Sequence, residues 1–334
     1  MSWDRPPPPP QDLLVATDVV KEFDVRAGVL QRVTGHVQAV SNINLTVHSG
    51  ETLGIVGESG CGKSTLGRVL MNLLPATSGS VRFEGREIAG LRERDMRPIR
   101  ARLQIVFQDP YASLNPRMCI GEIVGEPFLV HRGMNAAAAR PEIARLMETV
   151  GLSPEHTSRY PHEFSGGQRQ RIGIARALAL DPSMLILDEP VSALDVSIQA
   201  GIVNLLMELQ RERSLSYLFI AHDLSVVRHI AHRVGVMYLG KLVEIGPKEQ
   251  IFSAPRHPYT RALLSAVPVP DPTRERARRR IVLVGDVPSP IDPPSGCRFR
   301  TRCWKATEVC ATREPVLVGD ESGHAFACHH PEPA

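Results

Sequence analysis

The sequence lacks the features that mark a membrane-spanning or a secreted chain. It contains no uninterrupted apolar stretch of about 18 or more residues, which is what a membrane-spanning helix requires. Its first ten residues, which end in the run Pro6–Pro10, contain no apolar core of the kind found in secretory signals. We therefore expect a protein that stays in the cytoplasm and does not itself cross a membrane.

The chain also lacks a marked excess of charge. Lysine and arginine number 39 and aspartate and glutamate 36, so the formal net charge is only +3. This balance argues against nucleic-acid binding through bulk electrostatics, and we expect no nucleic-acid partner. The six cysteines are not expected to form disulfides, because the cytoplasm is reducing.

Proline is plentiful but unevenly distributed. Fifteen of the 28 prolines lie in residues 1–10 and 268–334, whereas residues 11–267 contain the remaining 13. We therefore expect three parts: a disordered Pro-rich tail at 1–10, a folded domain at 11–267 and a C-terminal extension at 268–334.

The central region alternates strands with helices. Strands are expected at Leu13–Phe23, Asn42–Val47, Thr52–Val56, Ser80–Phe83, Leu103–Phe107, Met184–Leu187, Leu215–Ala221 and Arg233–Tyr238, with Lys241–Ile245 as an edge and a hairpin or loop at Arg26–Gly35. Helices are expected at Ser64–Met71, Ala136–Val150, Gln168–Leu180 and Val196–Arg213. The wholly apolar run Met184–Leu187 is typical of a strand buried on both faces of a parallel sheet. The order predicts an α/β fold with a helical block inserted at about residues 109–180.

A phosphate-binding loop follows the strand expected at Thr52–Val56. The pattern G-x-x-x-x-G-K-[ST] is matched by Gly57, Glu58, Ser59, Gly60, Cys61, Gly62, Lys63 and Ser64, and Thr65 follows. Its glycines let backbone N–H groups converge on anionic oxygens at a helix N-terminus. Lys63 is expected to reach the β- and γ-phosphates and Ser64 to ligate Mg²⁺. A glycine-rich turn that matches by chance would not explain the strand and helix on either side.

Two acidic residues end the apolar strand. Asp188 and Glu189 directly follow Leu187, and neighbouring carboxylates at a buried strand end are costly without a cation. Asp188 suits a contact with Mg²⁺, directly or through water, and Glu189 can polarise a water that attacks the γ-phosphorus. An acidic turn or a helix start is the alternative explanation for this pair.

A second anion-binding feature opens the helix that begins near Gln168. Ser165 is a good N-cap, and Gly166 and Gly167 expose N–H groups at the positive end of the helix dipole. The alternative is a simple capped helix start. Farther along, His222 follows a predicted strand, where the alternative is a core histidine hydrogen-bonded to backbone.

In their order along the chain, these motifs resemble an ATP-binding cassette (ABC) ATPase over about residues 11–250. The resemblance rests on the phosphate-binding loop, Gln108 after a strand, Ser165-Gly166-Gly167-Gln168, Asp188-Glu189, Ser192-Ala193-Leu194-Asp195 and His222. It implies a P-loop NTPase with a RecA-like core, a β subdomain and an inserted helical subdomain. It also implies ATP and Mg²⁺ as ligands.

The resemblance assigns roles around the ATP bound by the chain itself. Glu189 would be the general base, and His222 would hold the γ-phosphate and the attacking water. Gln108 would join Ser64 and Asp188 at the Mg²⁺ and link the site to a membrane partner. Phe23 is the candidate for stacking on adenine, at a position where the family often has Tyr.

Other roles involve the partner subunit, because two cassettes of this family pair head to tail. Ser165, Gly166 and Gly167, with Gln168 beside them, would touch the γ-phosphate of the ATP bound by the partner. Asp195 would bridge the two subunits.

The C-terminal third resembles the ATPases of oligopeptide/dipeptide importers. The resemblance rests on His257-Pro258-Tyr259-Thr260-Arg261-Ala262-Leu263-Leu264 followed by Ala266-Val267-Pro268. It implies a peripheral subunit on the cytoplasmic face of the inner membrane, which works with a second, different ATPase, two permease subunits and an extracytoplasmic substrate-binding protein. A soluble ABC ATPase regulator and an importer of nickel or another small solute are the alternatives.

Four cysteines gather in the C-terminal extension. Cys297, Cys303, Cys310 and Cys328 are spaced more widely than the C-x₂₋₄-C pairs that are usual in zinc sites. Some members of the importer family hold a 4Fe–4S cluster on four cysteines of this extension, and the resemblance transfers that expectation to these positions. Zinc, with His324 or His329 as a further ligand, and unligated thiols are the alternatives. A metal there could gate the ATPase activity.

Overall fold

In the computed structural model the chain is described over residues 11–28, 32–268, 280–319 and 322–333. The tail expected at 1–10 lies outside these ranges. No helix among the described residues is long and apolar enough to cross a membrane.

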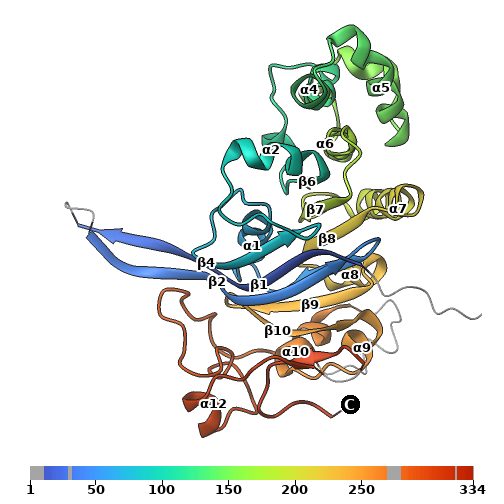
Figure 1. Cartoon of the computed structure of the whole chain (residues 1–334). Coiled ribbons are helices and arrows are strands. Elements are labelled where there is room, and N and C mark those ends of the chain that lie inside the picture. Colours follow the sequence, from blue (N-terminus) through green and yellow to red (C-terminus); the bar gives the residue numbers. More distant parts are fainter. Residues whose placement is uncertain (1–10, 29–31, 269–279, 320–321, 334) are drawn as a thin grey trace, which may run out of the picture.

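A four-stranded antiparallel sheet lies on one side of a second, eight-stranded sheet (Figure 1). Its strands are β1 (Asp12–Ala27), β2 (Arg32–His48), β4 (Ser78–Phe83) and β5 (Arg86–Glu87), in the order β2-β1-β4-β5. Apolar side chains of β1 and β2, among them Leu14, Val19 and Ile43, are fully buried. The expected hairpin at Arg26–Gly35 is confirmed, but both of its strands are longer than the sequence pattern indicated.

The second sheet contains the parallel strands that the apolar runs predicted. It has the order β11-β12-β10-β9-β3-β8-β7-β6, and β3 (Thr52–Val56), β6 (Leu103–Val106), β7 (Met184–Asp188), β8 (Ser216–Ala221) and β9 (Arg233–Tyr238) run parallel within it. Every residue of β3, β7 and β8 is buried, which explains why these strands are apolar without alternation. Because β3, β7 and β8 are neighbours, the residues after their carboxyl ends meet at one edge.

Helices pack around this sheet and form a separate block at one end of the molecule (Figure 1). Around the sheet lie α1 (Lys63–Leu70), α2 (Glu93–Arg102), α7 (Val196–Arg213), α8 (Leu224–Ile230), α9 (Lys248–Ser253) and α10 (Pro258–Ala266). The block contains α4 (Ile120–Arg132), α5 (Ala136–Thr149) and α6 (Gly166–Leu178), with the short α3 (Pro110–Ser113) and the 3₁₀ turns η1 (Pro154–Ser158) and η2 (Pro161–Glu163). Its core is apolar and includes Ile123, Phe128, Leu146 and Ile172, as expected for packed amphipathic helices.

The expectation that β10 (Lys241–Pro247) forms an edge of the sheet is wrong. Strand β12 (Ala325–Phe326) pairs antiparallel with β10, and β11 (Val318–Gly319) pairs with β12. These strands have two residues each, too few for a period-2 pattern, so no sequence signal announced them. The C-terminal extension, which also contains α12 (Glu308–Thr312), thereby joins the central sheet.

Buried polar residues lie where the extension meets β10. The carboxylate of Glu244, which is fully buried, accepts hydrogen bonds from the backbone N–H groups of Arg256 (2.6 Å) and His257 (3.0 Å). His324 Nε2 lies 2.7 Å from its Oε1. His257 caps α10 by accepting the N–H of Tyr259 at 3.1 Å on Nδ1. Burial lowers the pKa of His257 from 6.5 to about 4, although the charge of Glu244 opposes this change.

This low pKa predicts a loss of stability in mild acid. Between pH 6.5 and 4 the unfolded chain binds a proton at His257 that the folded chain does not, so the free energy of unfolding falls as the pH falls. At pH 5 the loss is roughly 2 kcal/mol. The variant His257→Asn keeps an N-cap acceptor but does not titrate. We expect its stability deficit relative to the wild type, measured by urea unfolding, to shrink between pH 7 and pH 5. A stability deficit that stays constant between pH 7 and pH 5 would contradict the lowered pKa of His257.

Candidate nucleotide-binding site

The phosphate-binding loop lies between β3 and α1, in a conformation that requires glycine. Gly57, Gly60 and Gly62 have φ values of 157°, 77° and 105°. A Cβ on Gly62 would lie 2.0 Å from the carbonyl oxygen of Ala39, and one on Gly57 would lie 2.2 Å from that of Met237. Among the described residues, no side chain caps the N-terminus of α1, so its first N–H groups are available to bind an anion.

The side chain of Lys63 lies within the phosphate-binding loop and is hydrogen-bonded to the loop backbone. Its side chain is buried, and Nζ donates hydrogen bonds to the carbonyl oxygens of Gly57 (2.9 Å) and Glu58 (3.0 Å). The ammonium group therefore lies where phosphate oxygens would be bound. Cys61 Sγ lies 3.9 Å from Nζ, but burial raises the pKa of this thiol despite the lysine, which keeps the sulfur protonated.

The carboxylate of Asp188 has the surroundings of a cation ligand. Oδ1 accepts a hydrogen bond from Ser64 Oγ at 2.7 Å. The other oxygen, Oδ2, is buried and has no hydrogen-bond partner among the described residues. Burial raises the pKa of Asp188, and the hydrogen bond from Ser64 only partly offsets this effect. An unpartnered, buried carboxylate oxygen beside a hydroxyl fits a hard cation such as Mg²⁺.

Glu189 brings two of the other predicted residues together. Its Oε2 accepts a hydrogen bond from Gln108 Nε2 at 2.9 Å and lies 3.3 Å from His222 Nδ1. The backbone of Glu189 has a positive φ of 47°, which is strained for a residue with a side chain. The backbone N–H of Glu189 donates to Ile220 on β8 at 2.9 Å, which helps to hold this conformation.

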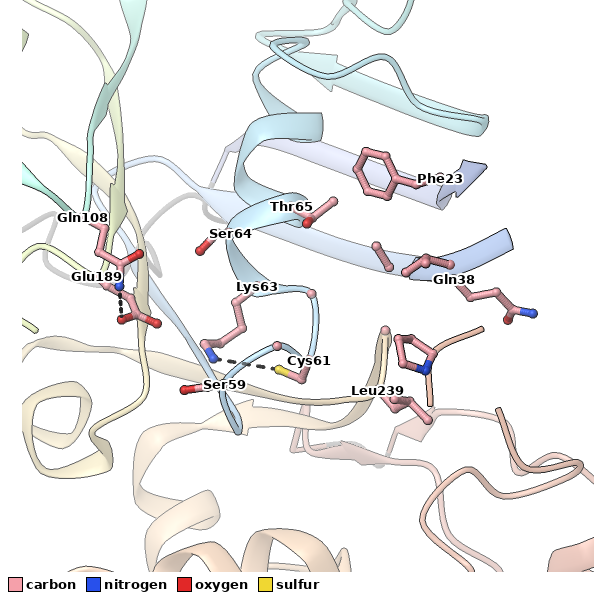
Figure 2. Close-up of a pocket in the computed structure, with 16 residues that line it drawn as sticks. Phe23, Gln38, Ser59, Cys61, Lys63, Ser64, Thr65, Gln108, Glu189 and Leu239 are labelled. Carbon is pink, nitrogen blue, oxygen red and sulfur yellow. Dashed lines mark hydrogen bonds between the residues drawn. The ribbon is translucent and has the colours of Figure 1, made fainter. Parts of the chain in front are cut away.

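Lys63, Ser64, Gln108 and Glu189 line an elongated pocket with an aromatic end and an acidic end (Figure 2), whereas Asp188 and His222 are not among its lining residues. Phe23, from β1, lies at one end, and Gln108 and Glu189 lie at the other, with Lys63 and Ser64 between them. Phe23 is 37% exposed and the ammonium of Lys21 lies over its ring, 4.8 Å from the centroid, so the exposed part of the ring can stack on a base. The pocket is also lined by Ser59, Gly60, Cys61, Gly62, Thr65, Val37, Gln38, Ala39, Leu239, Gly240 and Pro290.

The other predicted anion-binding residues do not line this pocket. Ser165 caps α6 in a reciprocal pair: its Oγ accepts the N–H of Gln168 at 3.3 Å, and its own N–H donates to Gln168 Oε1 at 2.9 Å. Gly167 packs so closely on α7 that a Cβ would lie 2.4 Å from Ile198. Asp195 is exposed at the start of α7. Within one chain, these residues lie outside the phosphate-binding pocket.

Residues far along the chain also contact the nucleotide pocket or its loop: the contact of Pro290 was missed by sequence reasoning, whereas Tyr259 was expected to pack back onto the cassette. The carbonyl oxygen of Pro290 accepts the N–H of Gln38 at 2.9 Å, and Pro290 lines the pocket. The hydroxyl of Tyr259 accepts the N–H of Glu58 at 3.0 Å. About 200 or more residues separate the partners of each contact, so no local pattern could have indicated them.

The four cysteines of the extension line one small pocket. Cys297, Cys303, Cys310 and Cys328 share it with His257, His329 and His330. Two of the sulfurs accept backbone N–H groups at 3.4 Å, Cys303 from Lys305 and Cys328 from His330. His324 is not among the residues that line it. In the described part of the chain, no three His, Cys, Asp or Glu side chains are already placed to hold one metal ion.

The thiols of this pocket favour their neutral form. Burial raises the pKa of Cys297, Cys303 and Cys328, the last to about 11. The charges of the neighbouring thiolates act in the same direction. A bound cation would reverse this preference, because thiolates are the form that ligates metals.

Comparisons with known proteins agree with this geometry. Residues 40–192 match the family model described as "ABC transporter", and residues 243–310 match "Oligopeptide/dipeptide transporter, C-terminal region". The chain is 52% identical to the oligopeptide transport ATP-binding protein AppF of Bacillus subtilis, over 96% of this chain and 97% of that protein. It is also 50% identical to the dipeptide transport ATP-binding protein DppF of Haemophilus influenzae, over 95% and 96%.

A solved structure shows the same cassette. A dimeric ATP-binding cassette bound to ADP and phosphate superposes with a TM-score of 0.63 at 28% identity, over 71% of this chain and 99% of the other. The α/β fold expected from the motifs is therefore confirmed. The chain belongs to the ABC transporter ATPases and, within them, to the ATP-binding subunits with an oligopeptide/dipeptide transporter C-terminal region.

Proposed function

We propose that this chain is the ATP-hydrolysing subunit that drives the import of di- and oligopeptides through a membrane permease. The observation that carries the proposal is the convergence of Lys63, Ser64, Gln108 and Glu189 on one pocket that has an aromatic side chain at its far end, with Asp188 hydrogen-bonded to Ser64 beside it. The relatives named for oligopeptide and dipeptide transport supply the substrate class.

The pocket accommodates ATP along its length. Phe23 stacks on adenine at the aromatic end, and backbone N–H groups of the pocket-lining residues 59–65 surround the phosphates. Lys63 exchanges its bonds to the carbonyl oxygens of the loop for the β- and γ-phosphate oxygens. Since both kinds of partner are oxygen acceptors at the same place, this exchange requires little movement of the side chain.

Mg²⁺ would be held by Ser64, Asp188 and Gln108. The unpartnered Oδ2 of Asp188 and the hydroxyl of Ser64 supply oxygen ligands beside the loop. When bound, the ion would offset the negative charge of the phosphate oxygens during phosphoryl transfer.

Glu189 acts as the general base. Its carboxylate takes a proton from the water that attacks the γ-phosphorus, while the bond from the γ-phosphorus to the bridging oxygen breaks to give ADP and phosphate. Gln108 and His222 contact Oε2 of Glu189, so both can orient this carboxylate and the water. His222 is half exposed, which leaves its ring available to the γ-phosphate.

The residues that face away from the pocket act on a second subunit. Ser165, Gly166, Gly167 and Gln168 close over the ATP of a partner cassette, and Asp195 bridges the pair. The exposure of Ser165 and Asp195, and the fact that none of these residues lines the chain's own pocket, support a head-to-tail dimer.

The remaining subunits follow from the proposed transport role. We place the chain at the cytoplasmic face of the inner membrane, with a second, different ATPase, two permease subunits and an extracytoplasmic substrate-binding protein. The division into a cassette at 11–267, with its helical subdomain at about 109–180, and an extension at 268–334 is part of the same proposal.

We further propose that Cys297, Cys303, Cys310 and Cys328 ligate a 4Fe–4S cluster. Their convergence on one pocket and the N–H groups directed at two of the sulfurs support a group bound through thiolates. Four thiolates that line one pocket would repel one another without a cation, so metal binding and folding of this segment would be coupled.

The role of Glu189 is tested by Glu189→Gln. This change keeps the shape and hydrogen-bonding capacity of the side chain but removes the base, so we expect ATP affinity near that of the wild type and turnover lower by at least about 100-fold. ATPase rates and ATP binding are measured in the assembled transporter. The control is Glu208→Gln, an exposed change on α7, which should hydrolyse ATP at the normal rate. Retained hydrolysis in Glu189→Gln would rule out this base.

The cysteine proposal is tested by metal analysis of the purified chain. The wild type should contain iron and sulfide and show a visible absorption band, and Cys303→Ser should lose both. Cys119→Ser changes a cysteine outside the pocket and should retain them. If zinc is found in place of iron, the cysteines form a zinc site and not an iron–sulfur cluster. If the protein contains neither metal, the proposal is ruled out.

A further inference from the structure

One segment of the C-terminal extension touches the phosphate-binding loop directly. The guanidinium of Arg302 donates two hydrogen bonds to the carboxylate of Glu58, Nη1 to Oε2 at 2.7 Å and Nη2 to Oε1 at 3.2 Å. The side chains of Arg302 and Glu58 are 8% and 26% exposed. A largely buried, two-bond ion pair of this kind is strong and geometrically specific.

The backbone of Glu58 is held by the same part of the molecule. Its N–H donates to the hydroxyl of Tyr259, and the Tyr259 ring packs against Tyr238 and Phe299 with centroid distances of 4.7 and 5.3 Å. All three rings are almost completely buried. Glu58 is therefore fixed through both its main chain and its side chain by groups outside the loop.

The position of Glu58 matters for the nucleotide because Glu58 is part of the backbone of the phosphate-binding loop and, in the absence of nucleotide, also contacts Lys63. The carbonyl oxygen of Glu58 accepts a hydrogen bond from Lys63 Nζ, the group that binds phosphate. The side chain of Glu58 does not line the nucleotide pocket. Arg302 therefore acts on the site through the backbone of Glu58 and has no direct contact with the nucleotide in the pocket.

The same segment forms part of the cysteine pocket at its other side. Cys297, Phe299 and Cys303 all line that pocket, and Phe299 also packs on Tyr259. Arg302 is adjacent in sequence to Cys303. Residues 297–303 thus form part of the four-cysteine pocket and, through Arg302, also contact the phosphate-binding loop.

We propose that residues 297–303 position the phosphate-binding loop through the Arg302–Glu58 pair and so couple the four-cysteine pocket to nucleotide binding. Arg302 is a positioning residue in this arrangement. Because coupling between two sites is reciprocal, nucleotide binding must also alter the accessibility of the cysteines. The inference rests on nucleotide binding at the loop, and it does not depend on which metal, if any, the cysteines hold.

The first test compares the affinity of variants for a non-hydrolysable ATP analogue with Mg²⁺, by calorimetry. Arg302→Met should weaken binding roughly tenfold, which is about 1.4 kcal/mol. Arg302→Lys keeps the positive charge but cannot form the two parallel hydrogen bonds of a guanidinium. Its affinity for the analogue should therefore lie between those of Arg302→Met and the wild type. Arg313→Met, a change at an exposed arginine of the same extension, should bind like the wild type.

A double-mutant cycle isolates the pair. Glu58→Gln should weaken binding, and the double variant Arg302→Met/Glu58→Gln should be no weaker than Arg302→Met alone, because one interaction is lost in each case. Thermal denaturation of every variant separates misfolding from a local effect. Unchanged affinity in Arg302→Met, or additive losses in the double variant, would overturn the proposal.

The second test measures the reciprocal effect. The full chain is treated with N-ethylmaleimide, and the alkylation of each cysteine is followed by peptide mass spectrometry. In the wild type, the ATP analogue should slow alkylation of Cys303 and Cys328 by at least about fivefold, and Cys119 should not change. In Arg302→Met at saturating analogue, the slowing should vanish.

The outcomes distinguish this inference from the proposed function. A wild type that binds no nucleotide would overturn both. A wild type that binds the analogue with no change in the cysteines, or an Arg302→Met variant that retains the protection, would overturn the coupling and leave the ATPase assignment intact.

Discussion

The parallel pairing of β3, β8 and β7 is the constraint on which the rest of the site depends. The registers Leu53 with Leu218 and Ile186 with Leu218 align the carboxyl ends of the three strands. Each strand is followed by a different element of the site: the phosphate-binding loop after β3, Glu189 after β7 and His222 after β8. A shift of one strand by one residue would turn its buried side chains to the opposite face and separate these groups.

At the same edge of the sheet lie a residue with a strained backbone, Glu189, and a buried carboxyl group, that of Asp188. Glu189 has a left-handed backbone, which costs about 1–3 kcal/mol in isolation, and its hydrogen bond to β8 holds it there. Asp188 retains a buried oxygen without a partner among the described residues. Such free-energy costs are typical of sites that bind a charged ligand, because the ligand supplies the partner that these groups lack in the folded protein.

The features that were predictable from the sequence are those encoded locally. The loop at Gly57–Ser64 requires glycines at fixed positions, and β7 has a run of apolar residues, so both were recognised, and Val196–Arg213 is α7 to the residue. The position of β10 was misjudged because its partner β12 lies about 80 residues later and contains two residues. The Arg302–Glu58 pair and the contribution of Pro290 to the nucleotide pocket were also missed. Contacts between residues far apart in the sequence produce no periodic pattern in either segment.

The pairing of β10 with β12 also affects how the chain is made. A ribosome adds about 5–20 residues per second, so β10 waits roughly 4–16 s before the residues of β12 emerge. During that interval β10 has an unpaired edge, and Glu244 lacks its contact with His324. Unpaired edges of this kind recruit strands from other chains. The nascent protein is therefore most prone to aggregate after its ATPase core has formed and before β12 has paired with β10. Chaperones would protect the chain most during this interval.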